Sequence, residues 1–410
     1  MKQQEKDILR RLGEQIVAVG SLPVQQEKKA LWRALNALRP VRPMVLVDEL
    51  PWHEMDIGGE LKAQCSDPLA VMIETELRRK LFQWKYFPAD MVIEPEINVY
   101  LPIYGLDYGM TIREETLATD ERNDVVSHNY LDQLQDERDL EKITLNELRV
   151  DEEGFARTLE IYHDVFDGVA PLHVVKGQVF GHFIDEIVMW HGAENLLYDV
   201  VDRPEFVHAL MRRMTDVSLH YLDQLEALHL YEERQDYIHC SAAFYDWPAE
   251  NREEIGSAAN AWTFGTSQIF SSVSAEMHEE FELPYLSEFF SRFGMVYYGC
   301  CEPLHNKMDM VRKYPHVRKV SVSPWADAAI AAKNIHGDFV VSNKPNPARV
   351  AVPFSPELVR SELASVRDVC EEYGCPLEYI LKDISTVQND PKRIIEWERC
   401  AMSVALERNK

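Results

Sequence analysis

Short apolar runs that alternate with helical stretches constrain the fold of this chain most strongly. From about residue 173 onward, runs of strand length are separated by segments with the apolar spacing of amphipathic helices. Parallel strands need such crossovers, because the chain must return to the same end of the sheet before the next strand begins. The predicted strands cover 44–47, 173–180, 237–240, 295–298, 317–322, 339–341 and 379–381, with a weaker candidate at Gln268-Ile269.

About eight strands of this kind predict an α/β fold, a (β/α)8 TIM-type barrel, with an open doubly wound sheet as the alternative. Two amphipathic helices, over 5–19 and 24–38, precede the first strand. We expect 1–38 to be an N-terminal helical extension that caps the barrel, forms a homodimer contact or docks a partner. Residues 39–410 are then the barrel domain, with an elaboration at about 88–172 where the periodicity is weak.

The strongly acidic composition narrows the classes of partner. A formal net charge of −26 disfavours nucleic acid and anionic membrane surfaces, because both are bound through clustered Lys and Arg. It fits a small neutral or cationic substrate, or a partner protein with a basic face. No apolar run approaches the roughly 20 residues of a membrane span, and the first residues are polar, so we expect a cytoplasmic protein.

Polar side chains cluster where the predicted strands end, which is where barrels of this type carry their chemistry. Cys300, Cys301, Glu302 and His305 form the densest group, and all four residue types can ligate zinc. Adjacent strand residues point to opposite faces, so we expect only one of the two thiols to face the pocket. The alternative is two buried thiols beside a carboxylate at the start of a helix. An odd count of seven cysteines at irregular spacing is no disulfide framework.

Other strand ends add further candidates. His53 beside Glu54 suits acid–base work, since imidazole titrates near neutrality, although an ordinary loop anchored by Trp52 is an equal alternative. Lys344 could contact an anionic group or simply be solvated. His239 is a candidate ligand from a neighbouring strand end.

Four segments resemble one known superfamily. Residues 180–182, 191–199 and 203–210, and the SAEMHEEFELPY segment at 274–285, are similar to stretches of the uroporphyrinogen decarboxylase superfamily. The resemblance covers roughly residues 40 to 405 and implies a (β/α)8 barrel. That superfamily includes porphyrinogen decarboxylases and methyltransferases that pass methyl groups to corrinoid proteins.

The residues after the first strand distinguish these two activities. The decarboxylases carry an arginine-rich segment there, which suits a polycarboxylate substrate. This chain instead has Asp48, Glu49 and Glu54 and no Arg between 48 and 54. The chain therefore resembles the corrinoid-dependent methyltransferase-like members more closely than the true decarboxylases.

In zinc-dependent members the resemblance implies a His-x-Cys pattern after one strand and a Cys near the last. Here Tyr298 stands in the His position of that pattern, Cys300 matches its Cys, and Asp383 lies near the last expected Cys. The expected metal residues are Cys300, Cys301, Glu302, His239 and Asp383. Alternatively, this member uses no zinc and activates its substrate by protonation.

The expected function is transfer of a methyl group from a small methylated substrate, such as an aromatic methyl ether, to a corrinoid. No Asp-x-His-x-x-Gly pattern is present, so the cobalamin should be supplied by a partner protein. Glu49, His53 and Glu54 are the catalytic candidates. The candidate substrate-binding residues are Trp52, Tyr298, Trp325, His182 and Lys344. A lyase or decarboxylase on the same barrel, and a non-enzymatic binding barrel, are the alternatives.

Overall fold

The computed structural model describes residues 1–118, 126–247 and 256–407. Its centre is a parallel six-stranded sheet in the order β1-β14-β13-β12-β11-β10. The strands are β1 (Met44–Val47), β10 (Trp262–Gly265), β11 (Met295–Tyr298), β12 (Val317–Val322), β13 (Val340–Asn343) and β14 (Leu377–Leu381). The predicted α/β class with a mainly parallel sheet is thereby confirmed.

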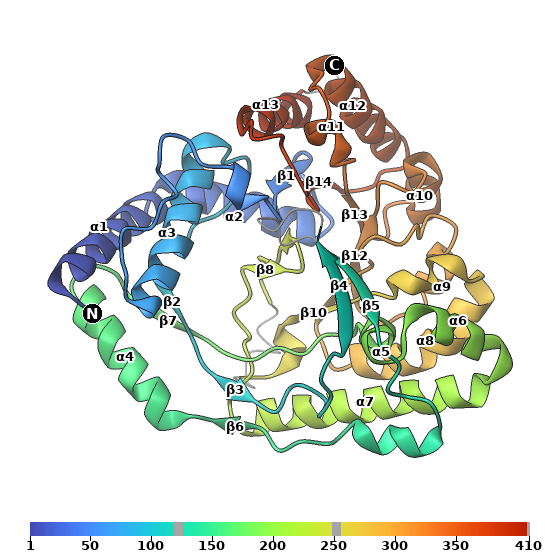
Figure 1. Cartoon of the computed structure of the whole chain (residues 1–410). Helices are drawn as coiled ribbons and strands as arrows, with labels where there is room; N and C mark the ends of the chain where they lie inside the picture. The colour runs from blue at the N-terminus through green and yellow to red at the C-terminus, as the bar shows by residue number, and fades with distance from the viewer. Residues whose placement is uncertain (119–125, 248–255, 408–410) are drawn as a thin grey trace.

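A second parallel pair continues the arrangement beyond β10. Strand β2 (Ile97–Tyr100) pairs with β7 (Leu172–Val175), and Gly181, downstream of β7, forms a parallel bridge to Gly265 at the end of β10. These strands surround a central region that contains β8 (Tyr237–Ile238), as Figure 1 shows. Among the described residues no ladder joins β1 to β2, so the closed barrel stays a prediction.

Alternate residues of the sheet face two separate cores. Val45 and Val47 of β1 pack with the layer that contains the outer helices, whereas Met44 and Leu46 pack in the interior. This alternation follows from the two-residue period of a strand. On β12 the interior-facing position is a lysine, Lys319, so the interior is polar on that side.

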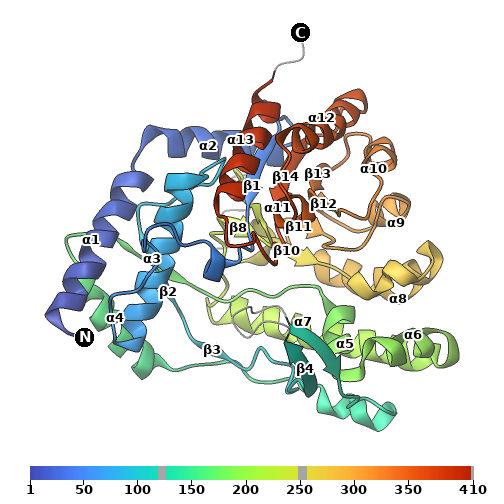
Figure 2. The ribbon, with the colours of Figure 1, turned by 45° about the horizontal axis from the view of Figure 1, so that its top comes forward.

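The outer layer consists of helices that cross between consecutive strands. Figure 2 shows α10, α12 and α13 on the outside of β12 to β14. Strong apolar periodicity predicts α12 and α13 closely, because both bury one face on the sheet. The helices of this layer are α5 (Phe183–His191), α6 (Ala193–Asp202), α7 (Pro204–Ala227), α8 (Ala275–Phe290), α9 (Met308–Val311), α10 (Ala328–Ile335), α11 (Ala348–Ala351), α12 (Pro356–Glu372) and α13 (Lys392–Leu406).

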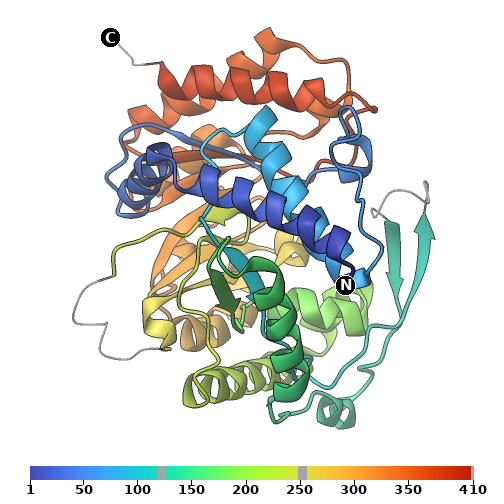
Figure 3. The same cartoon turned by 90° about the vertical axis from the view of Figure 1, so that its left-hand side faces the viewer.

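The two N-terminal helices lie against the body of the fold. Helix α1 (Gln3–Gly20) packs on α3 (Pro68–Tyr86) and α4 (Glu152–Phe166), as the blue and green ribbons show in Figure 3. Helix α2 (Pro23–Asn36) contacts β1. Trp32 is fully buried, and Asn36 donates to the carbonyl groups of Ala242 and Phe244. No helix of the described segments is long and apolar enough to cross a bilayer.

The region at 88–172 contains short antiparallel pairs besides β2 and α4. Strand β3 (Ile103–Tyr104) pairs with β6 (Arg149–Val150), and β4 (Glu114–Ala118) pairs with β5 (Val126–Tyr130). The β4–β5 ribbon, teal in Figure 3, projects from the body. The 3-10 helix η2 (Glu137–Lys142) follows the ribbon.

Three predicted elements differ from the structure. The apolar run at 237–240 is β8 (Tyr237–Ile238), which turns back at His239 (φ 53°) to pair antiparallel with β9 (Ser241–Ala242). The weak strand at Gln268-Ile269 is instead the 3-10 helix η5 (Gln268–Ser272), because Asp185 accepts from the Gln268 amide and the strand β10 ends before it. The segment from about Leu304 to the next strand, where the sequence favours a helix, contains only the short helix α9.

Candidate functional site

A carboxyl pair lies where the neighbouring strands β1 and β14 end. The Asp383 amide donates to Glu49 Oε2 at 3.1 Å, and Lys382 Nζ lies 3.3 Å from Glu49 Oε1 and 3.4 Å from Asp383 Oδ2. Burial and a hydrogen bond shared with the Asp383 carboxyl raise the pKa of Glu49 to about 7. Burial alone would raise the pKa of Asp383, but the bond to Glu49 and the charge of Lys382 lower it. Of the two carboxyls, Glu49 is therefore the one that binds a proton first as the pH falls towards 7.

Two adjacent thiols extend this pair towards β11. Lys382 Nζ donates to Cys300 Sγ at 3.6 Å, the two cysteine sulfurs lie 3.7 Å apart, and Cys301 Sγ lies 3.8 Å from Asp383 Oδ2. The hydrogen bond from Cys300 lowers the pKa of the Cys301 thiol against the effect of burial, and the same bond with burial raises the pKa of Cys300.

The expectation that only one thiol faces the site is wrong. Both cysteines follow Gly299, whose φ of 90° takes the chain out of the strand conformation, so the alternation of strand side chains no longer applies. Cys300 is buried and Cys301 half-buried, on the same side as Lys382.

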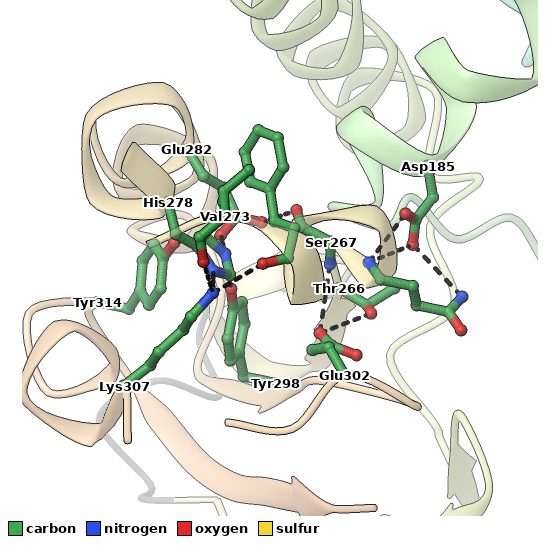
Figure 4. Close-up of polar contacts among 12 residues, drawn as sticks. Asp185, Thr266, Ser267, Val273, His278, Glu282, Tyr298, Glu302, Lys307 and Tyr314 are labelled. Atoms are coloured by element: carbon green, nitrogen blue, oxygen red, sulfur yellow. Dashed lines mark hydrogen bonds and ion pairs between the residues drawn. The ribbon is translucent and has the colours of Figure 1, made fainter. Parts of the chain in front are cut away.

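Glu302 anchors the loop after β11. Its Oε1 accepts from Thr266 Oγ1 at 2.9 Å and from the Ser267 amide, and its Oε2 accepts from the Cys300 amide at 2.8 Å. The labelled Glu302, Thr266 and Ser267 appear together in Figure 4. Both carboxylate oxygens are thus already engaged, which does not favour the expected role as a metal ligand.

His239 lies between the thiols and a cavity. Its ring stacks on Phe264, with ring centres 4.1 Å apart, and its Nε2 is buried with no hydrogen-bond partner in the described structure. The interaction with His239 favours the ionised form of both Cys300 and Asp383, because it acts to lower the pKa of each. Within the described residues, no three His, Cys, Asp or Glu side chains form a group that could hold a metal ion. The expected zinc site stays a prediction.

The loop after β1 contains the other catalytic candidates, in the 3-10 helix η1 (Trp52–Glu54). Glu54 accepts from Thr386 Oγ1 at 2.8 Å, and from the amides of Val387 at 2.7 Å and Asn389 at 3.1 Å. Burial raises the pKa of Glu54, but these amides outweigh it and lower the pKa below its usual value. These bonds favour the ionised carboxylate, which joins two loops, and do not favour Glu54 as a proton donor; its expected catalytic role stays a prediction. His53 Nε2 lies 3.7 Å from Glu54.

The aromatic candidates for substrate binding, Trp52, Tyr298 and Trp325, do not come together around one site. Trp52 packs edge-on to Phe82, and the Arg79 guanidinium lies 5.0 Å from its ring centre. Trp325 is 73% exposed, and Tyr298 points to the outer face of the sheet. His182 pairs with Glu186 at 2.8 Å.

Lys344 is buried, so the expectation of a solvated side chain is wrong. Its ammonium donates to Tyr297 Oη at 2.6 Å and to Ser342 Oγ at 2.7 Å. Further inside, Lys319 pairs with Glu378 at 2.8 Å, and both side chains are fully buried. This side of the interior therefore carries a row of paired polar groups.

The side chain of Tyr298 belongs to a buried network around Glu282 of α8 (Figure 4). The Glu282 carboxylate accepts from His278 at 2.6 Å, from Tyr298 at 2.5 Å, from Tyr314 at 2.6 Å and from Ser267. Lys307 Nζ lies 3.2 Å from the other ring nitrogen of His278. These donors and the His278 charge lower the pKa of Glu282 although burial raises it.

Sequence reasoning missed Lys382 and the Glu282 network as parts of this region. Lys382 directly follows the buried run 377–381, and that position was the available signal. For Glu282 the signal was its spacing of four residues from His278 on one helix face.

A cavity of about 440 Å³ adjoins the site at Asp48 and His239. It lies between β1, β2, β7 and the β8 strand, and its lining includes Tyr100, Asp236 and Tyr237. Its volume is in the range of pockets for small organic ligands.

Comparison with known proteins places the fold. No family model and no curated protein matches the chain. Among solved structures, a methyltransferase from Methanosarcina mazei is similar over 92% of this chain and 98% of that chain, with a TM-score of 0.53 and 12% sequence identity. The similarity is therefore one of fold along nearly the whole length of both chains.

Proposed function

We propose that this chain is a methyltransferase that moves a methyl group from a small methylated substrate to the corrinoid of a partner protein. The proposal includes membership of the uroporphyrinogen decarboxylase superfamily and a closed barrel. The fold shared with the Methanosarcina mazei methyltransferase supports it, and so does the absence of Arg around Glu49. The observation that carries it is the contact of the Glu49 and Asp383 carboxyls with Lys382 at the carboxyl ends of β1 and β14, an arrangement in which burial raises the pKa of Glu49.

Glu49 supplies the acid that a poor leaving group needs. When the methyl–oxygen bond of an aryl methyl ether breaks, the electron pair stays on oxygen, and the Glu49 proton neutralises the developing phenolate. The carboxylate that remains is stabilised by Lys382 at 3.3 Å. The cobalt of the partner's corrinoid accepts the methyl group.

Metal activation is the second form of the proposal. Cys300, Cys301 and Asp383 lie in successive contact, with His239 nearby, and these residue types suit zinc. In the described structure they do not converge into a group that could hold the ion, so binding would require their side chains to move together. A zinc ion there would act as the Lewis acid in place of the Glu49 proton. Metal analysis of the purified protein and of a Cys300→Ser, Cys301→Ser variant distinguishes the two forms: equal zinc content in both proteins contradicts this ligand set.

The test mixes the protein with a reduced corrinoid protein and a panel of methoxyarenes, and follows methylated corrinoid by absorbance. We expect methyl transfer with at least one donor, and a loss of about 100-fold in the Glu49→Gln variant. The surface variant Glu153→Gln, in which the replaced side chain is 91% exposed, should match the wild type. Carbon dioxide without methylated corrinoid would favour the decarboxylase alternative, and ligand binding without any turnover would favour a binding barrel.

A further inference from the structure

The cavity beside His239 has an unequal charge balance. Five carboxylates line it, Asp48, Glu94, Glu96, Glu232 and Asp236, against two cationic side chains, Lys80 and Arg234. Glu94 is also paired with Lys29, which lies outside the lining, so four carboxylates remain to be balanced within it. Both cations already have partners: Arg234 pairs with Glu96 and lies 3.5 Å from Asp236, and Lys80 pairs with Glu76 at 2.7 Å.

Asp48 is the carboxylate of this lining that is closest along the chain to Glu49, and it is half-buried. Its Oδ1 accepts from the Glu49 amide, and it forms no ion pair with any described residue. An ionised carboxylate in a partly desolvated cavity attracts a cation more strongly than one in open solvent. The cavity therefore favours a positively charged guest and repels an anionic one.

The rest of the lining fits an organic cation better than a metal ion. The rings of Tyr100 and Tyr237 line the cavity and are 54% and 40% exposed, so the protein does not cover them. Aromatic faces attract alkylammonium groups by cation–π interaction, and apolar residues such as Val92 and Ile93 contribute contact for methyl groups. No group of metal-ligating side chains forms in the described part of the chain.

The lining also offers neutral hydrogen-bonding groups. Asn98 and Gln178 line the cavity, and neither side chain hydrogen-bonds to another described residue. Each could bind a hydroxyl or carbonyl group at the uncharged end of a ligand.

We propose that this cavity binds a small organic ammonium cation and that the substrate of the methyltransferase carries such a group. Only the identification of the cation as the substrate rests on the proposed function. The binding of the cation follows from the lining of the cavity itself. His239 then marks the boundary between the bound ammonium and the reacting end near Cys300 and Glu49.

Calorimetric titration with choline and with its uncharged isostere 3,3-dimethylbutan-1-ol tests the inference. We expect saturable choline binding that is about tenfold tighter than binding of the isostere and that weakens as sodium chloride is raised. Asp48→Asn should weaken choline binding about fivefold and leave the isostere unaffected. Glu153→Gln is the matched surface control, and Tyr237→Leu, which keeps all charges, should weaken choline through loss of the ring.

Three results would overturn the inference: no saturable choline binding, equal affinity for choline and the isostere, or tighter binding of 3,3-dimethylbutyrate than of choline. Circular dichroism of each variant separates a lost site from a lost fold. The methyl-transfer panel fails or succeeds independently. Selective choline binding without any methyl transfer contradicts the proposed function alone, and methyl transfer without choline selectivity contradicts this inference alone.

Discussion

Glu49 and Glu54 lie in the same loop, and the fold gives them opposite protonation behaviour. Burial and a hydrogen bond with the Asp383 carboxyl raise the pKa of Glu49 to about 7. Glu54 receives two backbone amides and a hydroxyl, so its pKa falls. Interactions that favour the charged carboxylate thus outweigh burial at Glu54, whereas at Glu49 burial and the neighbouring Asp383 carboxyl outweigh them.

The pKa of Glu49 predicts the pH dependence of the reaction. A proton donor must be protonated, so we expect kcat/KM for a methoxyarene to be constant below pH 7 and to fall as the pH rises through about 7. Initial rates across a pH series measure this. Glu54→Gln should keep the inflection and Glu49→Gln should lose it; an unchanged inflection in Glu49→Gln would mean that another group is the donor.

The Glu282 network predicts a stability effect remote from the site. Tyr314→Phe removes one hydrogen bond to a fully buried carboxylate, which should lower the free energy of unfolding by about 1.5–3 kcal/mol. Because the pKa of Glu282 is lowered in the folded state, its carboxylate stabilises the fold above pH 4.5, the ordinary pKa of a glutamate. This stabilisation is lost as the pH falls below that value. Urea unfolding at pH 7 measures the difference. Tyr198→Phe, at a 61% exposed position, should change nothing, and an equal effect there would refute the assignment.

Among the elements, α2 holds the first strand in place. Trp32 is fully buried, and its indole nitrogen donates to the Asp90 carbonyl at 2.9 Å. The Asp90 side chain in turn accepts from the Val45 amide at 2.8 Å in β1. The N-terminal helices therefore support the strand that leads into Glu49.

We expect Trp32→Ala to destabilise the protein by about 3–5 kcal/mol, because it leaves a large cavity and an unpaired carbonyl. Trp325→Ala removes the same side chain from a 73% exposed position and should change stability little. Thermal and urea unfolding of both variants provide the comparison. Similar losses in the two variants would show that α2 packs more loosely than the structure indicates.

At the scale of the whole molecule, the strands differ in how many neighbours they have. Strand β12 is paired on both sides, whereas β2 is paired to β7 and, within the described residues, has no ladder to β1. The cavity lies at this seam, between β1 and β2. An unpaired strand edge leaves room for a ligand and exposes backbone groups.

Hydrogen exchange tests this seam. We expect the amides of β2 to exchange faster than those of β12, because a strand paired on one side opens locally at lower free energy. Mass spectrometry of peptides that cover 97–100 and 317–322 measures the difference. Equal protection of the two strands would instead indicate the closed barrel predicted from the sequence.

The sequence alone determined the elements with strong periodicity. The bounds of β1 follow from a continuous apolar run that buries both faces of the strand, and nearly those of α12 and α13 follow from the apolar spacing of one buried helix face. It also placed Glu49, Cys300 and Asp383 at strand ends, where their chemistry is expected.

Only the tertiary structure decided what these residues do. Glu49 is buried against Asp383, more than 300 positions away in the chain, and Glu54 accepts from amides that are equally distant. The burial of Lys344 and the turn at His239 likewise depend on neighbouring strands. Protonation and burial are set by which groups meet across the sheet, and local sequence patterns carry no record of those partners.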